Sequence, residues 1–167
     1  MVRKYLPFVV LIAAIIVAIT GCSILESGKG KWKMFLKEGV YEDPDTYVPK
    51  LDDIGDFVGM VDDASVLIER QDKYENSVVA LETYVYVSSD RDIRLGIDGD
   101  DGVGLYVDEN LVCSKPNAED PMVMCDIHFT AGWHRVDVLV YNGPLDIYLA
   151  FDKKLSDLVD EMDANHR

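Results

Sequence analysis

Residues 79–112 read VALETYVYVSSDRDIRLGIDGDDGVGLYVDENLV, and this stretch decides the fold class. Apolar and polar side chains alternate within it in three runs, 79–87, 92–98 and 103–107. A period of two is typical of a β-strand with one face on a core and the other face in water. Clusters of serine, aspartate and glycine separate the runs and favour tight turns. The stretch therefore predicts three consecutive strands.

The same pattern continues on both sides of that stretch. It predicts further strands over residues 32–36, 57–60, 65–69, 123–129, 135–140 and 145–151. The polar stretch 41–50 (YEDPDTYVPK) is expected to be a loop, and residues 154–167 a tail or one short helix. Many short strands between turns are typical of an all-β fold. We therefore expect an antiparallel, jelly-roll-like β-sandwich.

The N-terminus reads MVRKYLPFVVLIAAIIVAITGCSIL, which has the layout of an export signal. Arg3 and Lys4 precede a long uncharged apolar run that ends in small residues. The junction before Cys22 resembles the bacterial lipobox, in which the chain is cut before the cysteine and the thiol is lipidated. The resemblance implies a signal peptide over 1–21 and stable anchoring through palmitate-type acyl chains on Cys22. An uncleaved membrane-spanning helix over 5–25 is the alternative.

Either interpretation places the remainder of the chain outside the cytoplasm, because the positively charged end stays inside. Residues 22–30 are polar after the cysteine and contain two glycines, so we expect a flexible tether. In a host with two membranes, Ser23 after the cysteine matches the usual sorting pattern for the outer membrane. The expected location is the cell membrane or the outer membrane, facing the periplasm or the exterior.

The length and the charge of the chain limit its partners. A chain of 167 residues without its export segment has room for one domain. It has 31 acidic and 16 basic residues, and the net charge of −15 becomes more negative when Arg3 and Lys4 are removed. Such a charge repels nucleic acid, so no nucleic-acid partner is expected. It suits a solvated surface or divalent cations.

Three motifs in order carry a resemblance to a known type of domain. Asp100-Asp101-Gly102-Val103 follows an aromatic strand, a tight turn comes at Asp108-Glu109-Asn110, and Gly132-Trp133 precedes a later strand. This order resembles the galactose-binding-like jelly-roll domains of secreted proteins, and the related sugar-binding domain type of anthrax protective antigen. The turn lacks the usual glycine. The resemblance implies a carbohydrate-binding sandwich over residues 31–153.

Asp98, Asp100 and Asp101 put three carboxylates on one predicted turn. Oxygen ligands at this density suit a hard cation such as calcium. In calcium-dependent members of the protective-antigen type, paired aspartates hold the ion and the ion holds sugar hydroxyls. The alternative is turn chemistry, in which aspartates bond nearby backbone N–H groups.

Aromatic residues provide candidate contacts to a sugar ring. Tyr84, Tyr86, Tyr106 and Tyr148 lie on the polar parity of their predicted strands, and Trp133 begins another strand. Exposed aromatic side chains often mark binding surfaces. Tyr106 and Trp133 are the candidate stacking residues, although tryptophan in this position also serves as a core or edge plug.

Cys113 and Cys125 are the two cysteines besides Cys22, and they flank the loop SKPNAEDPMVM. In an exported protein this pair predicts a disulfide that closes a hairpin. A zinc site with His128 and His134 is the alternative. Strand parity disfavours it, because Cys125 and His128 point to opposite faces.

The sequence lacks the common catalytic motifs, including Gly-x-Ser-x-Gly, His-Glu-x-x-His and a phosphate-binding glycine loop. We therefore expect a binding module and not an enzyme. Its expected ligand is an envelope or extracellular carbohydrate, and calcium is the candidate cofactor. The alternative is a structural lipoprotein that docks on an envelope protein and has no sugar site.

Overall fold

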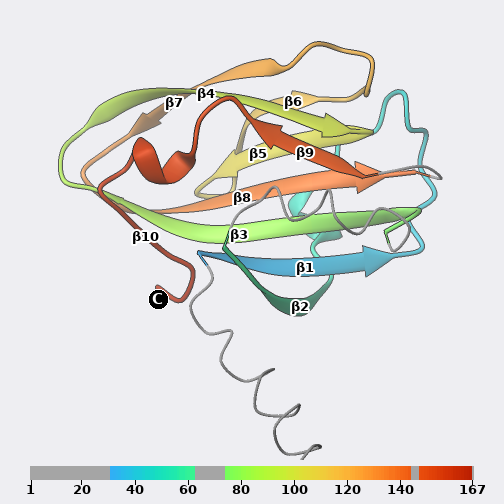
Figure 1. Ribbon diagram of the computed structural model, residues 1–167, viewed down its shortest axis with the longest axis horizontal. Coiled ribbons are helices and arrows are strands. Elements are labelled where there is room, and N and C mark those ends of the chain that lie inside the picture. Colours follow the sequence, from blue (N-terminus) through green and yellow to red (C-terminus); the bar gives the residue numbers. More distant parts are fainter. Residues whose placement is uncertain (1–30, 63–73, 144–146, 167) are drawn as a thin grey trace, which may run out of the picture.

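The computed structural model describes residues 31–62, 74–143 and 147–166. These residues form ten strands and two short 3-10 turns (Figure 1). The strands are β1 (Trp32–Glu38), β2 (Asp56–Val61), β3 (Ser77–Val87), β4 (Arg91–Asp100), β5 (Gly102–Val107), β6 (Asn110–Lys115), β7 (Val123–Phe129), β8 (Gly132–Asn142), β9 (Tyr148–Phe151) and β10 (Glu161–Asp163). The 3-10 turns are η1 (Leu51–Asp53) and η3 (Leu155–Asp157).

The strands pair in two antiparallel sheets, which confirms the predicted all-β sandwich. The larger sheet has the order β2-β1-β3-β8-β5-β6, and β10 also pairs with β3. The smaller sheet has the order β7-β4-β9. Eight of the nine predicted strand runs fall within or overlap observed strands. The ninth, 65–69, lies outside the described residues.

The core lies between the two sheets and follows from the alternation. Every second residue of β3, β5 and β8 points inward, and most of these side chains are aliphatic, with Ser77, Thr83, His134 and Asn142 as the buried polar members. The inward residues of β4 and β7 meet them from the smaller sheet, with Phe129 and Leu95 fully buried. Burying each such side chain contributes about 1.5–3 kcal/mol to folding.

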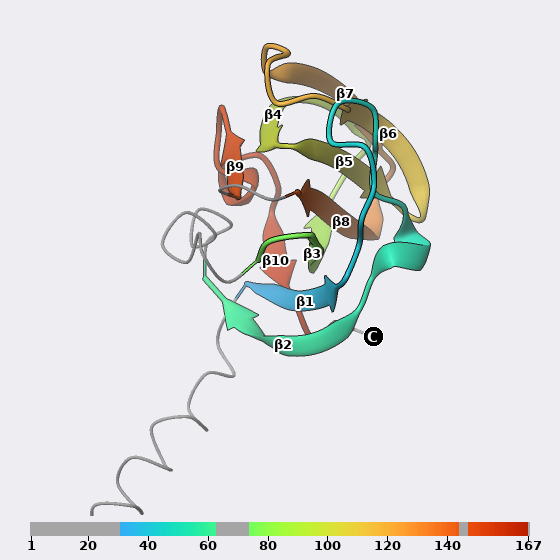
Figure 2. The same cartoon turned by 90° about the vertical axis from the view of Figure 1, so that its right-hand side faces the viewer.

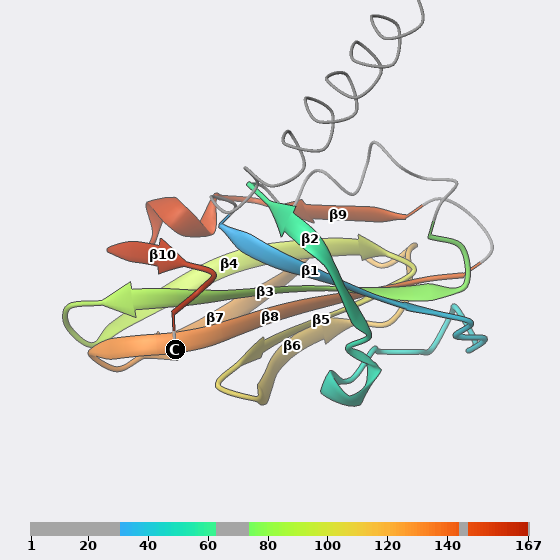
Figure 3. The ribbon, with the colours of Figure 1, turned by 90° about the horizontal axis from the view of Figure 1, so that it is seen from below.

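The C-terminal segment packs against the sandwich, where the sequence predicted a tail or one short helix after residue 153. The chain makes the η3 turn with Leu155 buried in the core, and β10 then adds to β3 with Met162 opposite Val85 (Figure 3). Arg91 holds this segment by donating two hydrogen bonds from Nη2 to the carboxylate of Asp160, at 3.0 and 2.9 Å. The apolar residues whose spacing predicted a helix or a tail include Leu155 of the 3-10 turn and Met162 of the short strand.

The disulfide between Cys113 and Cys125 is present, but the predicted hairpin is not. The Cα atoms of the two cysteines are 5.6 Å apart, within the usual range. β6 pairs with β5 in the larger sheet and β7 pairs with β4 in the smaller one. The bridge therefore staples the two sheets together along one side of the sandwich. Local alternation predicts strands without showing which sheet each one joins.

The turn without glycine is a two-residue hairpin loop between β5 and β6. Val107 pairs with Asn110, and the residues between them, Asp108 and Glu109, have φ angles of 46° and 66°. Two positive φ angles in a row are the signature of a type I′ turn, whose twist matches that of the flanking strands. Neither residue is a glycine, so both adopt the left-handed backbone conformation at an energetic cost that glycine avoids.

Candidate functional site

The outer face of the larger sheet changes character along its strands. At one end it is apolar, with Val78, Ala80, Leu139 and Tyr141 buried together. Residues 40–54 cover this end, and the ring of Tyr47 packs edge-on against Tyr141 with centroids 5.0 Å apart. This end is closed by the protein itself, and the remainder of the outer face is the candidate surface.

Tyr106 belongs to the closed end. It is 7% exposed, and its hydroxyl donates a hydrogen bond of 2.8 Å to the carbonyl of Pro49. Burial raises the pKa of its hydroxyl, and the charge of Asp53 adds to this effect. The ring is packed under the covering loop, and a role for Tyr106 in sugar stacking stays a prediction.

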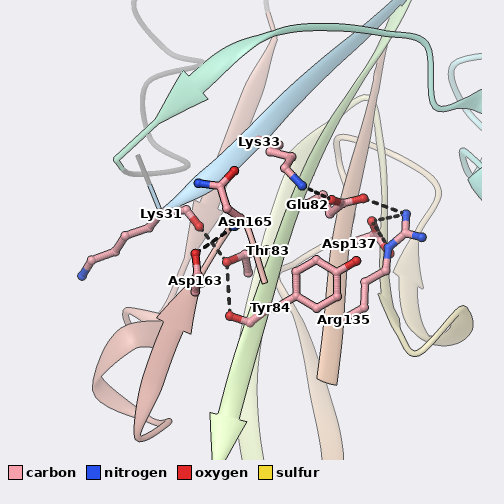
Figure 4. Close-up of polar contacts among 9 residues, drawn as sticks. All are labelled: Lys31, Lys33, Glu82, Thr83, Tyr84, Arg135, Asp137, Asp163 and Asn165. Atoms are coloured by element: carbon pink, nitrogen blue, oxygen red, sulfur yellow. Dashed lines mark hydrogen bonds and ion pairs between the residues drawn. The ribbon is translucent and has the colours of Figure 1, made fainter. Parts of the chain in front are cut away.

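The middle of the outer face has four charged side chains of alternating sign from β1, β3 and β8, which we call the charged cluster: Lys33, Glu82, Arg135 and Asp137 (Figure 4). Lys33 Nζ is 3.1 Å from Glu82 Oε1, and Arg135 Nη2 is 3.1 Å from Glu82 Oε2. Arg135 also donates from Nε and Nη2 to Asp137 Oδ1, at 3.1 and 2.9 Å. Lys33 and Arg135 remain 26% and 27% exposed, so both cations can reach a ligand.

Asp137 is the buried member of the charged cluster. Its side chain is 0% exposed, and its Oδ2 atom has no hydrogen-bond partner among the described residues. Burial raises the pKa of this carboxyl to about 6, against the opposing effect of Arg135. A buried acceptor without a partner is costly when ionised, which is why the carboxyl holds its proton to a higher pH than an exposed aspartate does.

Beyond the charged cluster lie four ring side chains, which we call the aromatic strip: Tyr84, Tyr86, Trp133 and His166. Tyr86 and Trp133 are opposite each other on β3 and β8, with ring centroids 5.4 Å apart. His166 stacks on Trp133 at 3.8 Å with 15° between the planes. All four side chains are half-buried, so each keeps part of its surface in solvent.

The charged cluster and the aromatic strip form one continuous surface. Lys33 Nζ lies 5.9 Å from the centroid of the Tyr84 ring, and Tyr84 is paired in register with Arg135. The two groups therefore meet at Tyr84 and Arg135. Such a surface offers flat apolar faces beside hydrogen-bond donors and acceptors.

The three aspartates predicted to bind calcium have different surroundings. Lys115 is 3% exposed, and its Nζ donates to Asp98 Oδ1 at 2.5 Å, to the Gly99 carbonyl at 3.1 Å and to the Ala118 carbonyl at 3.1 Å. The carboxylate of Asp101 accepts a hydrogen bond of 2.6 Å from the N–H of Gly143. Among the described residues, no three His, Cys, Asp or Glu side chains converge as a metal site would need. Calcium binding through Asp98, Asp100 and Asp101 stays a prediction.

The histidines of the alternative zinc site are bonded elsewhere. His134 contacts Asp108 Oδ2 through Nδ1 at 2.6 Å and the Thr130 carbonyl through Nε2 at 2.7 Å. Burial lowers the pKa of His134, but these two hydrogen bonds and the charge of Asp108 outweigh it and the pKa is raised. With both cysteine sulfurs in the disulfide, the thiolate ligands of that site do not exist.

No family model, no curated protein and no solved structure matches this chain. Within the part of the chain that the structure describes, no helix is long and apolar enough to cross a membrane. The predicted signal peptide, Cys22 and the tether lie outside the described residues.

The predicted and observed site residues overlap in part. Tyr84 and Tyr86 were expected on the polar parity of their strands and Trp133 was a candidate stacking residue, and the structure brings the three together. The sequence reasoning missed Lys33, Glu82, Arg135, Asp137 and His166. Strand parity was a usable signal for the four charged residues. Lys33, Glu82 and Asp137 share one cross-strand row, and Arg135 has the same parity as Asp137 on β8.

Proposed function

We propose that this protein is an exported, lipid-anchored binding protein that holds carbohydrate on the aromatic strip and the charged cluster. The observation that carries the proposal is the Tyr86–Trp133 ring pair beside the half-buried cations of Arg135 and Lys33. A sugar ring has apolar C–H faces and a rim of hydroxyls. The aromatic rings suit the faces, and the charged groups suit the rim.

The charge balance of the site favours a neutral glycan. The two cations of the charged cluster are matched by two carboxylates, Glu82 and Asp137. The chain as a whole carries a net charge of −15, which repels polyanions. Glu82 can accept hydroxyl hydrogen bonds while Arg135 donates them, and hydrogen bonds to charged groups contribute about 1.5–3 kcal/mol each. The surface needs no metal ion for these contacts.

The anchor would keep this surface close to a membrane. Cys22 lies nine positions before Lys31, the first described residue. A fully extended chain of that length spans about 30 Å. The binding surface would therefore act on glycans of the envelope or immediately outside it.

Thermal melts with a glycan panel test the proposal. We would use residues 23–167, which keep every residue that the structure describes, and add neutral and charged oligosaccharides in turn. A ligand of the folded state raises the midpoint by mass action. We expect a neutral glycan to do so, and Trp133→Ala to weaken it by about tenfold or more. Tyr41→Ala is the matched control, because Tyr41 is 80% exposed and outside the surface.

A second candidate function is docking on an envelope protein. β2 is the last strand of the larger sheet among the described strands, and it exposes Phe57 and Val58 at 56% and 51%. An exposed apolar edge strand is a template for an added strand from a partner. If no glycan binds, and Phe57→Lys abolishes one stoichiometric complex formed in the envelope, this second function is the correct one.

A further inference from the structure

The sandwich is closed on one side and open on the other. The disulfide between β6 and β7 staples one side, whereas β9 forms the opposite border of the smaller sheet (Figure 2). At that border the smaller sheet faces β1 and β10 of the larger one, with the η3 turn beside them. A cavity of about 570 Å³ opens there, a size typical of small-molecule sites.

The floor of this cavity is apolar and reaches the core. Trp32, Leu149 and Leu155 line it and are 5%, 0% and 5% exposed. Phe151 and Met162 complete the apolar lining, and the ring of Phe151 stacks on that of Trp32 with centroids 6.4 Å apart. A ligand that enters can therefore bury an apolar chain against aromatic and aliphatic side chains.

The rim of the cavity gathers basic side chains in a strongly acidic protein. Lys31, Lys153 and Lys154 line it, together with the carboxylates of Asp62, Asp152 and Asp157. The Oδ1 atom of Asp152 is engaged by the N–H of Gly96 at 2.6 Å, and its Oδ2 is 3.9 Å from Lys153. Among the described residues, the ammonium groups of Lys31 and Lys154 form no ion pair with a carboxylate. Both remain available to an anionic group.

We infer that this cavity binds an anionic amphiphile, with one apolar chain on the Trp32–Leu155 floor and the anionic head at the rim beside Lys31 and Lys154. Apolar burial drives entry of the tail, and the lysines orient the head. The inference does not depend on the proposed carbohydrate site, which lies on the outer face of the larger sheet. Two sources share this chemistry, a free fatty acid and a lipid of the adjacent membrane.

Titration of residues 23–167 with monomeric dodecanoate tests the inference. The readout is the indole N–H signal of Trp32, which lines the cavity, and Trp133 is the only other tryptophan. We expect dodecanoate to shift the Trp32 signal and leave the Trp133 signal in place. Dodecanol has the same tail without the charge and should bind about tenfold more weakly.

Charge reversal separates the site from general surface attraction. Lys31→Glu with Lys154→Glu should weaken dodecanoate binding by about tenfold or more, since both changes add repulsion at the rim. Lys50→Glu is the control, because Lys50 lies in the loop that covers the outer face of the larger sheet, and it should leave the affinity unchanged. A Trp32 signal that does not move, or equal binding by the double variant, overturns the inference.

Vesicles distinguish the two sources. Sedimentation with phosphatidylglycerol vesicles, and with phosphatidylcholine vesicles for comparison, reports on binding to a membrane lipid. Dodecanoate binding without vesicle binding supports a free fatty acid as the ligand. Binding to both dodecanoate and anionic vesicles that the double variant loses supports a membrane lipid. Binding to neither overturns the inference.

Discussion

The imidazole of His166 lies flat on the indole of Trp133, with ring centroids 3.8 Å apart and 15° between the planes. The contact joins the C-terminal segment to β8, and it occupies one face of the ring that we propose for sugar stacking. A ligand must use the other exposed part of Trp133 or displace His166. The C-terminal segment thus limits access to the aromatic strip.

His166→Ala should expose Trp133. We expect acrylamide to quench the fluorescence of Trp133 more strongly in this variant, because one ring face becomes accessible. A Trp32→Phe background isolates the Trp133 signal, since the chain has two tryptophans. The stacking contributes about 0.5–1.5 kcal/mol, so the free energy of unfolding should fall by no more than that. Unchanged quenching would show that the stacking does not persist in solution.

Asp137 should make the stability depend on pH. Burial raises the pKa of its carboxyl to about 6 in the folded protein, from an ordinary value of 3.8. The proton is therefore bound more tightly in the folded state. The stabilisation from this group is complete below about pH 4 and is lost as the pH rises through 6, by about 3 kcal/mol.

Asp137→Asn removes that titration. Urea denaturation at several pH values from 4 to 7 measures the free energy of unfolding of both proteins. We expect the free energy of unfolding of the variant, relative to that of the wild type, to increase by about 3 kcal/mol between pH 4 and pH 7. Only the wild type loses stability through this group. Other groups titrate in both proteins and cancel in the difference. A difference that stays constant with pH contradicts the buried position of Asp137.

Glu109→Gly should stabilise the protein. Glu109 has a φ of 66° in the β5–β6 turn, a conformation that costs a side-chain residue about 1 kcal/mol and glycine very little. We expect a gain of up to about 1 kcal/mol in the free energy of unfolding, measured by urea denaturation. Glu109→Ala is the control, because it removes the same carboxylate and keeps the strained backbone. Equal effects of the two variants would assign the change to charge alone.

Lys115→Met should destabilise the protein by about 3 kcal/mol. The change removes a buried ammonium from Asp98 and from the carbonyls of Gly99 and Ala118, and it leaves the carboxylate without its cation. Lys154→Met is the control, because Lys154 lies at the surface and its replacement should cost less than about 0.5 kcal/mol. Similar midpoints for the two variants in a denaturant series would contradict the buried pairing.

The sandwich was predictable from the sequence because its signal is local. Alternation in 79–87 follows from the strand geometry of β3 alone, and it also places Tyr84 and Tyr86 on the outer face. The sheet to which a strand belongs depends on distant partners. The Cys113–Cys125 pairing was predictable from the two cysteines alone. That the bridge joins the two sheets was not predictable, because it depends on which sheet each strand joins.

The candidate site was predictable only in outline. Parity placed Tyr84 and Tyr86 on the polar face, but the burial of Asp137 depends on tertiary packing. The stacking of His166 depends on the path of the C-terminal segment after η3, and the pairing of Asp98 with Lys115 joins β4 to β6. Long-range contacts of this kind produce no repeating pattern in the sequence, so alternation does not predict them.

The most direct test of the proposed carbohydrate surface is the indole N–H signal of Trp133 during titration with the glycan that gives the largest thermal shift. The signal of Trp32 serves as the internal reference, because Trp32 is 5% exposed and lies in the core. We predict that the Trp133 signal moves to saturation while the Trp32 signal stays in place, and that Trp133→Ala reduces the thermal shift. A glycan that binds without moving the Trp133 signal would contradict the assignment of the aromatic strip as the binding surface.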